Sequence, residues 1–318
     1  MSNNFDETFP RPQAGPFGVV REDGDQERVT VLVAAFEGWN DAGDAATDAV
    51  QFLATHYGAK DVFEVTSDDY YDYQFSRPLV RRGATGDVKI VWPTTRLSTA
   101  TVPGTNLDLV LLHGWEPSYR WRSFTAELLE QATLLDVDFV VMVGALLADV
   151  PHTRPIPVTK TSDTAELQDE LGIDSSQYEG PTGIVGLLSH MASLGGFPTV
   201  SLWAAVPHYV AQSPSPKAEL ALLRELEELL SITLPLDAIA EDAEAWERGV
   251  NELASDDPEI AAYVQQLEEA KDTTDLPEAT GDAIAKEFER YLRRRRAGSS
   301  RPSRARSVTA PSHRRSSR

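Results

Sequence analysis

Residues 28–46 read Arg-Val-Thr-Val-Leu-Val-Ala-Ala-Phe-Glu-Gly-Trp-Asn-Asp-Ala-Gly-Asp-Ala-Ala. Residues 29–36 are almost entirely apolar, which is typical of a strand covered on both faces of a sheet. After Asn40-Asp41, apolar residues recur at helical spacing and predict a helix: Ala42, Ala45, Ala46, Ala49, Val50 and Leu53. A buried strand that leads directly into an amphipathic helix is the repeating unit of an α/β fold.

The same alternation continues along the chain. Further strands are predicted at Val62–Thr66, Val88–Trp92, Leu107–His113, Val137–Gly144 and Val200–Ala205. Helices are predicted at Phe124–Gln131 and at Ile184–Leu194, the latter ended by Gly195-Gly196. Near the start, Asp23-Gly24 favours a tight hairpin turn. These elements predict a three-layer α/β/α core domain over residues 17–210.

Residues 211–296 are predicted to form an all-helical C-terminal subdomain. A linker-like Gln212-Ser-Pro-Ser-Pro precedes a Leu-rich helix over 218–230, and Asp257-Pro258 restarts a helix at once, which predicts two antiparallel neighbours. A final helix is expected to carry Ile284, Phe288, Tyr291 and Leu292. Between the Leu-rich helix and Asp257, apolar residues at spacings of three and four form a narrow seam: Leu236, Ile239, Ala243, Trp246, Val250 and Leu253.

The net charge differs sharply between the body of the chain, residues 1–290, and its tail, residues 291–318. The chain has 29 Lys and Arg against 50 Asp and Glu, a formal net charge of −21. Residues 291–318 hold ten Arg and no acid, so residues 1–290 carry 19 basic against 50 acidic residues, a net charge of −31. Such a body repels nucleic acid and anionic membranes. The Arg- and Ser-rich segment 297–318 is predicted to be disordered, and residues 1–16 to be flexible.

Several classes of protein are excluded by composition. The chain has no cysteine, so disulfides, thiol nucleophiles and thiolate metal sites are excluded. The start lacks the basic and apolar regions of a signal peptide, and no apolar run approaches the ~20 residues that span a bilayer. A cytoplasmic location is expected.

The candidate functional edge is the strand end that carries Glu37, Trp39, Asn40, Asp41 and Asp44. In open α/β sheets ligands bind at the carboxyl ends of the strands. There is no Gly-rich phosphate loop, and three acids at a helix N-terminus oppose a phosphate. The competing interpretation is structural: Asn40 or Asp41 caps the helix, and the acids favour its positive end.

Other candidates follow the later strands. Arg77 ends a Tyr-rich segment over 67–78 and could pair with Asp72 or Glu37, or could hold a substrate carboxylate or phosphate. Other polar residues of the candidate edge are Glu116, Arg120, Glu179, Thr182 and His208. His113 is the best general-base candidate, although such a histidine more often serves as a hydrogen-bonded core residue. The six histidines are scattered and no catalytic motif occurs, so no metal, no cofactor and no catalytic residue are predicted.

The motifs described so far resemble one known family. Residues 35–46, the Tyr-rich segment that ends in Arg77-Pro78, Glu179-Gly-Pro-Thr-Gly183 and Trp203-Ala-Ala-Val-Pro-His-Tyr209 are similar to the proteasome assembly chaperone 2 family, in its actinobacterial form. The resemblance covers roughly residues 28–292. It implies a phosphorylase/hydrolase-like α/β/α fold with a mixed sheet, frequent homotrimers, and eukaryotic relatives that help proteasome α-rings to assemble without catalysis. The hydrophobic-Tyr-X C-terminus by which those relatives dock is not carried over, because this chain ends Arg315-Ser-Ser-Arg318.

The resulting hypothesis is a non-enzymatic, self-assembling protein that acts through protein–protein contacts, with proteasome subunits as possible partners. The alternative is a small-molecule hydrolase or nucleoside-type transferase or binder, with Glu37, Asp41, Arg77 and Glu179 lining its site. A third interpretation, nucleic-acid binding, rests on the Arg-rich tail alone.

Overall fold

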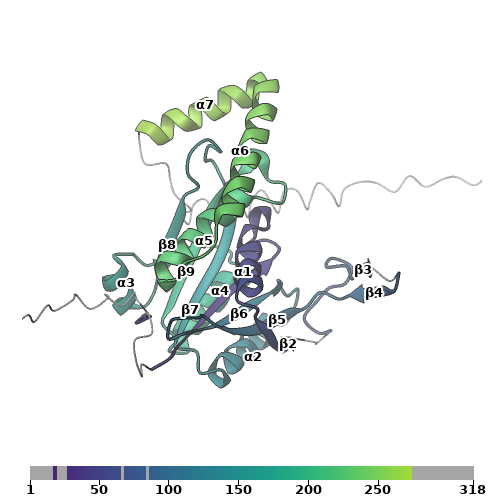
Figure 1. Cartoon of the computed structure of the whole chain (residues 1–318), viewed down its shortest axis with the longest axis vertical. Coiled ribbons are helices and arrows are strands. Elements are labelled where there is room, and N and C mark those ends of the chain that lie inside the picture. Colours follow the sequence, from purple (N-terminus) through teal and green to yellow (C-terminus); the bar gives the residue numbers. More distant parts are fainter. Residues whose placement is uncertain (1–16, 20–26, 66–67, 84–85, 274–318) are drawn as a thin grey trace, which may run out of the picture.

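A seven-stranded mixed sheet forms the centre of the molecule (Figure 1). The computed structural model describes residues 17–19, 27–65, 68–83 and 86–273. The strand order is β2-β5-β6-β1-β7-β9-β8. The strands span β1 Val29–Glu37, β2 Lys60–Val65, β5 Thr95–Thr101, β6 Leu107–Trp115, β7 Phe139–Ala148, β8 Val158–Ser162 and β9 Thr199–Pro207.

The middle of the sheet is parallel and its edges are antiparallel. β1 pairs in parallel with β6 on one side and β7 on the other, and β9 is parallel to β7. β2, β5 and β8 run antiparallel to their neighbours. The mixed sheet that the resemblance implied is therefore confirmed.

Alternation along β1 separates the two cores. Val31, Val33 and Ala35 face one hydrophobic cluster, and the intervening Leu32, Ala34 and Phe36 face the other. The first cluster is covered by α1 (Ala45–His56) and α5 (Pro216–Leu230), and the second by α2 (Trp121–Leu134) and α4 (Ile184–Leu194). Both faces are covered by helices, which gives the predicted three layers.

The C-terminal helices begin inside the core. Six residues of α5 lie in the same cluster as β1, so the proposed boundary after residue 210 does not separate two hydrophobic cores. α6 (Asp237–Asp256) packs on α5, and α7 (Pro258–Thr273) follows it. Figure 1 shows α7 crossing the end of α6 rather than lying antiparallel beside it. The apolar seam predicted for this helix differs at its last position: Leu253 of α6 is 65% exposed, and the next residue, Ala254, is buried instead.

Some short elements differ from the prediction. Residues predicted as strand 88–92 form β4 (Val88–Val91), which pairs with β3 (Leu79–Arg82) in a separate hairpin outside the main sheet. β5, β8 and the short helix α3 (Ala165–Leu171) were not predicted, because their sequences are polar and lack a clear apolar period. The Asp23-Gly24 turn, the expected helix over 284–292 and both terminal segments lie outside the described residues.

Candidate functional site

The candidate edge lies where the chain changes direction across the sheet. β1 is central, β6 lies on one side and β7 on the other, so the carboxyl ends of these strands enclose a topological switch point. Ligands of open α/β sheets bind in the crevice at such a point. Glu37 ends β1, Trp115 ends β6, and Ala148 ends β7.

The loop after β1 is fastened to the neighbouring strand. The carbonyl oxygen of Asn40 accepts a hydrogen bond from the backbone N–H of Ala145 at 2.8 Å, and Asp41 forms a parallel bridge with the same residue. Gly43, at φ +66°, passes against Ser215, whose N–H donates to the Gly43 carbonyl at 2.8 Å. A side chain at position 43 would collide with Ser215, so glycine is required there.

Asp41 caps the first helix, as the structural interpretation of this motif predicted. Its carboxylate accepts hydrogen bonds from the backbone N–H groups of Ala46 at 2.7 Å and Thr47 at 3.2 Å, and from the Thr47 hydroxyl. Burial raises the pKa of Asp41 to about 7, although these hydrogen bonds oppose the shift.

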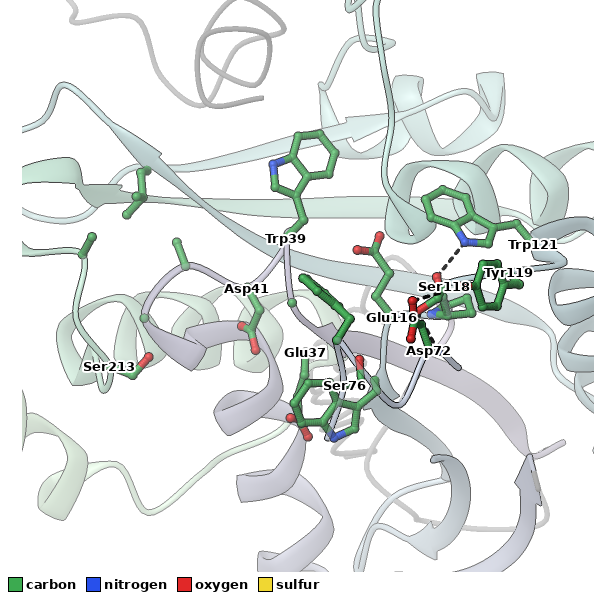
Figure 2. Close-up of a pocket in the computed structure, with 18 residues that line it drawn as sticks. Glu37, Trp39, Asp41, Asp72, Ser76, Glu116, Ser118, Tyr119, Trp121 and Ser213 are labelled. Atoms are coloured by element: carbon green, nitrogen blue, oxygen red, sulfur yellow. Dashed lines mark hydrogen bonds between the residues drawn. The ribbon is translucent and has the colours of Figure 1, made fainter. Parts of the chain in front are cut away.

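A cavity of 540 Å³, which we call the switch-point cavity, opens beside this loop (Figure 2). Its walls come from the β1–α1 loop, the Tyr-rich loop, the segment that follows β6, the end of β7 and the segment before α5. Eighteen residues line it: Glu37, Gly38, Trp39, Asp41, Ala42, Gly43, Asp72, Phe75, Ser76, Trp115, Glu116, Pro117, Ser118, Tyr119, Trp121, Leu147, Ala211 and Ser213.

Two further carboxylates at this cavity have different surroundings. Glu116 accepts a hydrogen bond from the Ile184 N–H at 2.9 Å and thereby caps α4; burial raises its pKa. Glu37 is half-buried, and its carboxylate makes no hydrogen bond or ion pair with the described residues. Burial, followed by the negative charges of Asp44 and Asp48, raises the pKa of Glu37.

A second cavity, of 290 Å³, lies on the other side of Trp39, which lines both. Asn40, Thr182 and Gly183 contribute to it. Asn40 is 4% exposed, and a β-carbon at position 183 would overlap its side-chain oxygen and come within 2.8 Å of the Trp39 ring. The Gly183 of the Glu-Gly-Pro-Thr-Gly motif therefore permits the close contact between the β1–α1 loop and α4.

The remaining predicted residues lie outside both cavities. Asp44, Arg77 and Glu179 are exposed, and Arg120 forms an exposed ion pair with Asp69 at 2.7 Å. His208, which follows β9, has its ring Nδ1 3.2 Å from the carboxylate of Asp149, which follows β7. Among the described residues Arg77 forms no ion pair with Asp72 or Glu37, and the Asp72 carboxylate accepts hydrogen bonds from the Tyr119 hydroxyl and the Gln74 backbone N–H. His113 lies within β6, beside Arg96 of β5, and lines neither cavity.

The Tyr-rich loop contributes residues that the sequence did not identify. Its Tyr70 and Tyr71 are buried in the core, and the Tyr70 carbonyl accepts hydrogen bonds from the N–H groups of Ser118 and Tyr119. This anchoring brings Phe75 and Ser76 to the cavity beside Trp115. Their position depends on contacts between segments about 45 residues apart, and no local pattern signals it.

The described residues hold neither a metal-binding cluster nor a membrane-spanning helix. No group of three or more His, Cys, Asp or Glu side chains in the described part of the chain is arranged to hold a metal ion. Within the same residues, no helix is both long and apolar enough to cross a bilayer.

The sequence profile of the PAC2 family matches residues 35–254, a range that contains every residue of the switch-point cavity. The chain belongs to the PAC2 family. No curated protein matches it. Among solved structures, a PAC2 family protein from Streptomyces avermitilis is 51% identical, with a TM-score of 0.69, over 74% of this chain and 99% of that chain.

Two other solved structures extend the comparison. A Mycobacterium tuberculosis protein described as a proteasome-assembly chaperone homologue is 48% identical, with a TM-score of 0.67, over 74% of this chain and 99% of that one. Pyrococcus furiosus PbaB, described as an archaeal proteasome activator, is 16% identical, with a TM-score of 0.56, over 74% of this chain and 97% of that chain. At that identity PbaB shares the fold alone.

Proposed function

We propose that this PAC2 protein acts through protein–protein contacts, as a self-assembling relative of proteasome assembly chaperones, and not as an enzyme. The 48% identical Mycobacterium tuberculosis protein, described as a proteasome-assembly chaperone homologue, supports the chaperone-like role. Proteasome subunits are the proposed partners, a homotrimer is the proposed assembly, and the cytoplasm is the proposed location. The observation that carries the proposal is the β3–β4 hairpin.

This hairpin exposes an unusual amount of apolar surface. Every residue of β3 and β4 is exposed, and Figure 1 shows the pair standing apart from the seven-stranded sheet. A two-stranded hairpin is marginally stable alone in water, and exposed apolar patches mark contact sites. Five of its apolar side chains and Trp92, which follows β4, are between 42% and 68% exposed: Leu79, Val80, Val88, Ile90, Val91 and Trp92.

The charge of the hairpin favours a second copy of the chain as its partner. Arg81, Arg82 and Lys89 are exposed on it, whereas residues 1–290 as a whole carry −31. In the strand register the Val80–Ile90 and Arg82–Val88 pairs share one face, and the Leu79–Val91 and Arg81–Lys89 pairs share the other, so apolar and cationic side chains lie together on both faces. Exposed apolar surface interspersed with cations suits an acidic neighbour of the same sequence.

The test compares the molar mass of the wild-type protein with that of the double variant Val80→Asp/Ile90→Asp by size-exclusion chromatography with light scattering. We expect an oligomer for the wild type and a monomer for the variant. Leu194→Asp is the matched control, because Leu194 is 70% exposed at the end of α4 and should leave the mass unchanged. The role of the hairpin in self-assembly is refuted if the wild type is monomeric at about 10 μM, or if the double variant keeps the molar mass of the wild-type oligomer.

The proteasome partner is tested separately in the native cell. Affinity purification of the tagged full-length chain, read by mass spectrometry, should recover proteasome subunits, and deletion should slow proteasome maturation. The hydrolase or transferase alternative relied on Arg77 and Glu179 at the candidate site, and neither residue lines the switch-point cavity.

A further inference from the structure

We propose that the switch-point cavity binds an organic cation, an ammonium or guanidinium group carried on a short chain. The inference concerns a different part of the molecule from the β3–β4 hairpin and goes beyond the proposed function. It is opposite in sign to the alternative in which Arg77 holds a substrate carboxylate or phosphate at this edge.

Two polar side chains at the cavity lack partners among the described residues. The Glu37 carboxylate is half-buried and makes neither a hydrogen bond nor an ion pair there. Ser76 is 2% exposed, its hydroxyl makes no hydrogen bond within the described part of the chain, and it lines the same cavity. A partly buried charge is costly without a partner, and the Ser76 hydroxyl is free to accept a hydrogen bond from a ligand. A bound ammonium or guanidinium group would donate hydrogen bonds to both.

The charge of the lining selects the sign of the ligand. Glu37, Asp41, Asp72 and Glu116 line the cavity, and no Lys, Arg or His is among its eighteen residues. Carboxylates in a partly enclosed site attract cations and repel phosphate and carboxylate ligands. Burial raises the pKa of Glu37 and Glu116, and that of Asp41 to about 7, so a bound cation would favour the ionised forms.

Aromatic side chains provide the other half of the site. Trp39, Phe75, Trp115, Tyr119 and Trp121 all line the cavity, and Figure 2 shows Trp39 and Trp121 on either side of the Glu116 carboxylate. Aromatic faces attract ammonium and guanidinium groups, and Trp is the strongest of them. Phe75 and Tyr119 are 58% and 51% exposed, which leaves room for a ligand to cover them. The volume of 540 Å³ lies within the usual range for small-molecule sites.

The experiment is isothermal titration calorimetry with the full-length chain at pH 8 and low ionic strength. Two arms distinguish the source of the cation: agmatine represents a free organic amine, and an acetylated Gly-Arg-Gly amide represents an arginine presented by a polypeptide. Citrate and the neutral N-butylurea are the negative probes. We expect saturable binding of at least one cationic probe and none of the negative probes.

Variants link the binding to the cavity. Glu37→Gln should lower the affinity for the cationic probe by about tenfold or more. It should keep or raise the Tm, because it removes a partly buried charge that has no partner among the described residues. Glu130→Gln, at an exposed position of α2, should change neither. The proposal is overturned if neither cationic probe binds up to 10 mM on the scale of weak ligands. It is also overturned if folded Glu37→Gln binds as well as the wild type.

Discussion

At the scale of single residues, the acidic side chains of this protein differ most in their surroundings. Glu219 on α5 is 9% exposed, and burial, with the charges of Asp48 and Asp242, raises its pKa to about 7. Asp41 reaches a similar value but caps a helix, so its charge has a structural use. The carboxylate of Glu219 makes no hydrogen bond or ion pair with the described residues, so its charge at neutral pH only destabilises the fold.

Glu219→Gln is therefore expected to stabilise the protein at pH 8. A carboxyl whose pKa is raised in the folded state binds more protons there than in the unfolded state, so its contribution falls as pH rises from about 4.5 to about 7. The gain should be on the order of 2 kcal/mol at pH 8 and near zero at pH 4. Thermal unfolding from pH 4 to 8 checks this, with the exposed Glu241→Gln as control. An equal gain at both pH values would contradict the assignment.

Substitution of glycine by alanine should have opposite effects on stability at positions 183 and 249. Gly183→Ala would force the new methyl group against Asn40 and Trp39, at a cost of about 1–3 kcal/mol. Gly249→Ala lies in α6, where a β-carbon meets nothing within 4 Å, and should stabilise by about 0.5–1 kcal/mol. Urea denaturation of both variants measures the difference. If both were neutral, the contact between the β1–α1 loop and α4 would not be as close as described.

At the scale of elements, the segment after β7 connects the last three helices. The buried ring of His152 hydrogen-bonds with Tyr209 at 2.8 Å and with Asn251 of α6 at 3.1 Å, and Lys217 of α5 donates to its carbonyl oxygen. Next to it, Arg154 pairs with Asp272 of α7 at 2.7 Å. These contacts place α6 and α7 on the body although neither helix contributes to its main sheet.

Replacing His152 should loosen α6 and α7 before the sheet. Burial lowers the pKa of His152, so the neutral ring is favoured in the fold and its stabilising contribution is lost as pH falls below its ordinary value of about 6.5. His152→Ala should cost about 2–4 kcal/mol. Hydrogen exchange by mass spectrometry should show faster exchange in α6 and α7 at pH 7, with β1 and β7 unchanged. Uniform acceleration would indicate global destabilisation instead.

The elements also show what the sequence could and could not predict. β1, β6, β7 and β9 are continuous apolar strands, so their existence and the three layers followed from composition and period. β5 and β8 are polar and take their conformation from the strands beside them. Glu37, Trp39, Asp41 and Glu116 were predicted as site residues, but Phe75 and Ser76 reach the cavity through a loop anchored by long-range contacts.

At the scale of the whole molecule, the acidic body should repel itself. Residues 1–290 carry a net charge of −31, because only 19 basic residues are available to pair with 50 acidic ones. Self-repulsion destabilises a compact state, and salt screens it.

Raising NaCl from 20 to 500 mM should therefore stabilise the protein by about 1 kcal/mol, which corresponds to a Tm increase of roughly 2–4 °C. Scanning calorimetry at fixed protein concentration measures this. A truncation after Leu292, which removes the Arg-rich segment and leaves the body still acidic, should show a larger increase. A Tm that falls with salt would show that ion pairs outweigh the repulsion.

The attachment of the β1–α1 loop to β7 has a kinetic consequence. Because the Asn40 carbonyl is bonded to Ala145 in the sheet itself, this wall of the cavity becomes ordered when the protein folds and not when a ligand arrives. A cation would then meet a site already in its binding geometry. Its association should be a single step, slowed by added salt and independent of any loop closure.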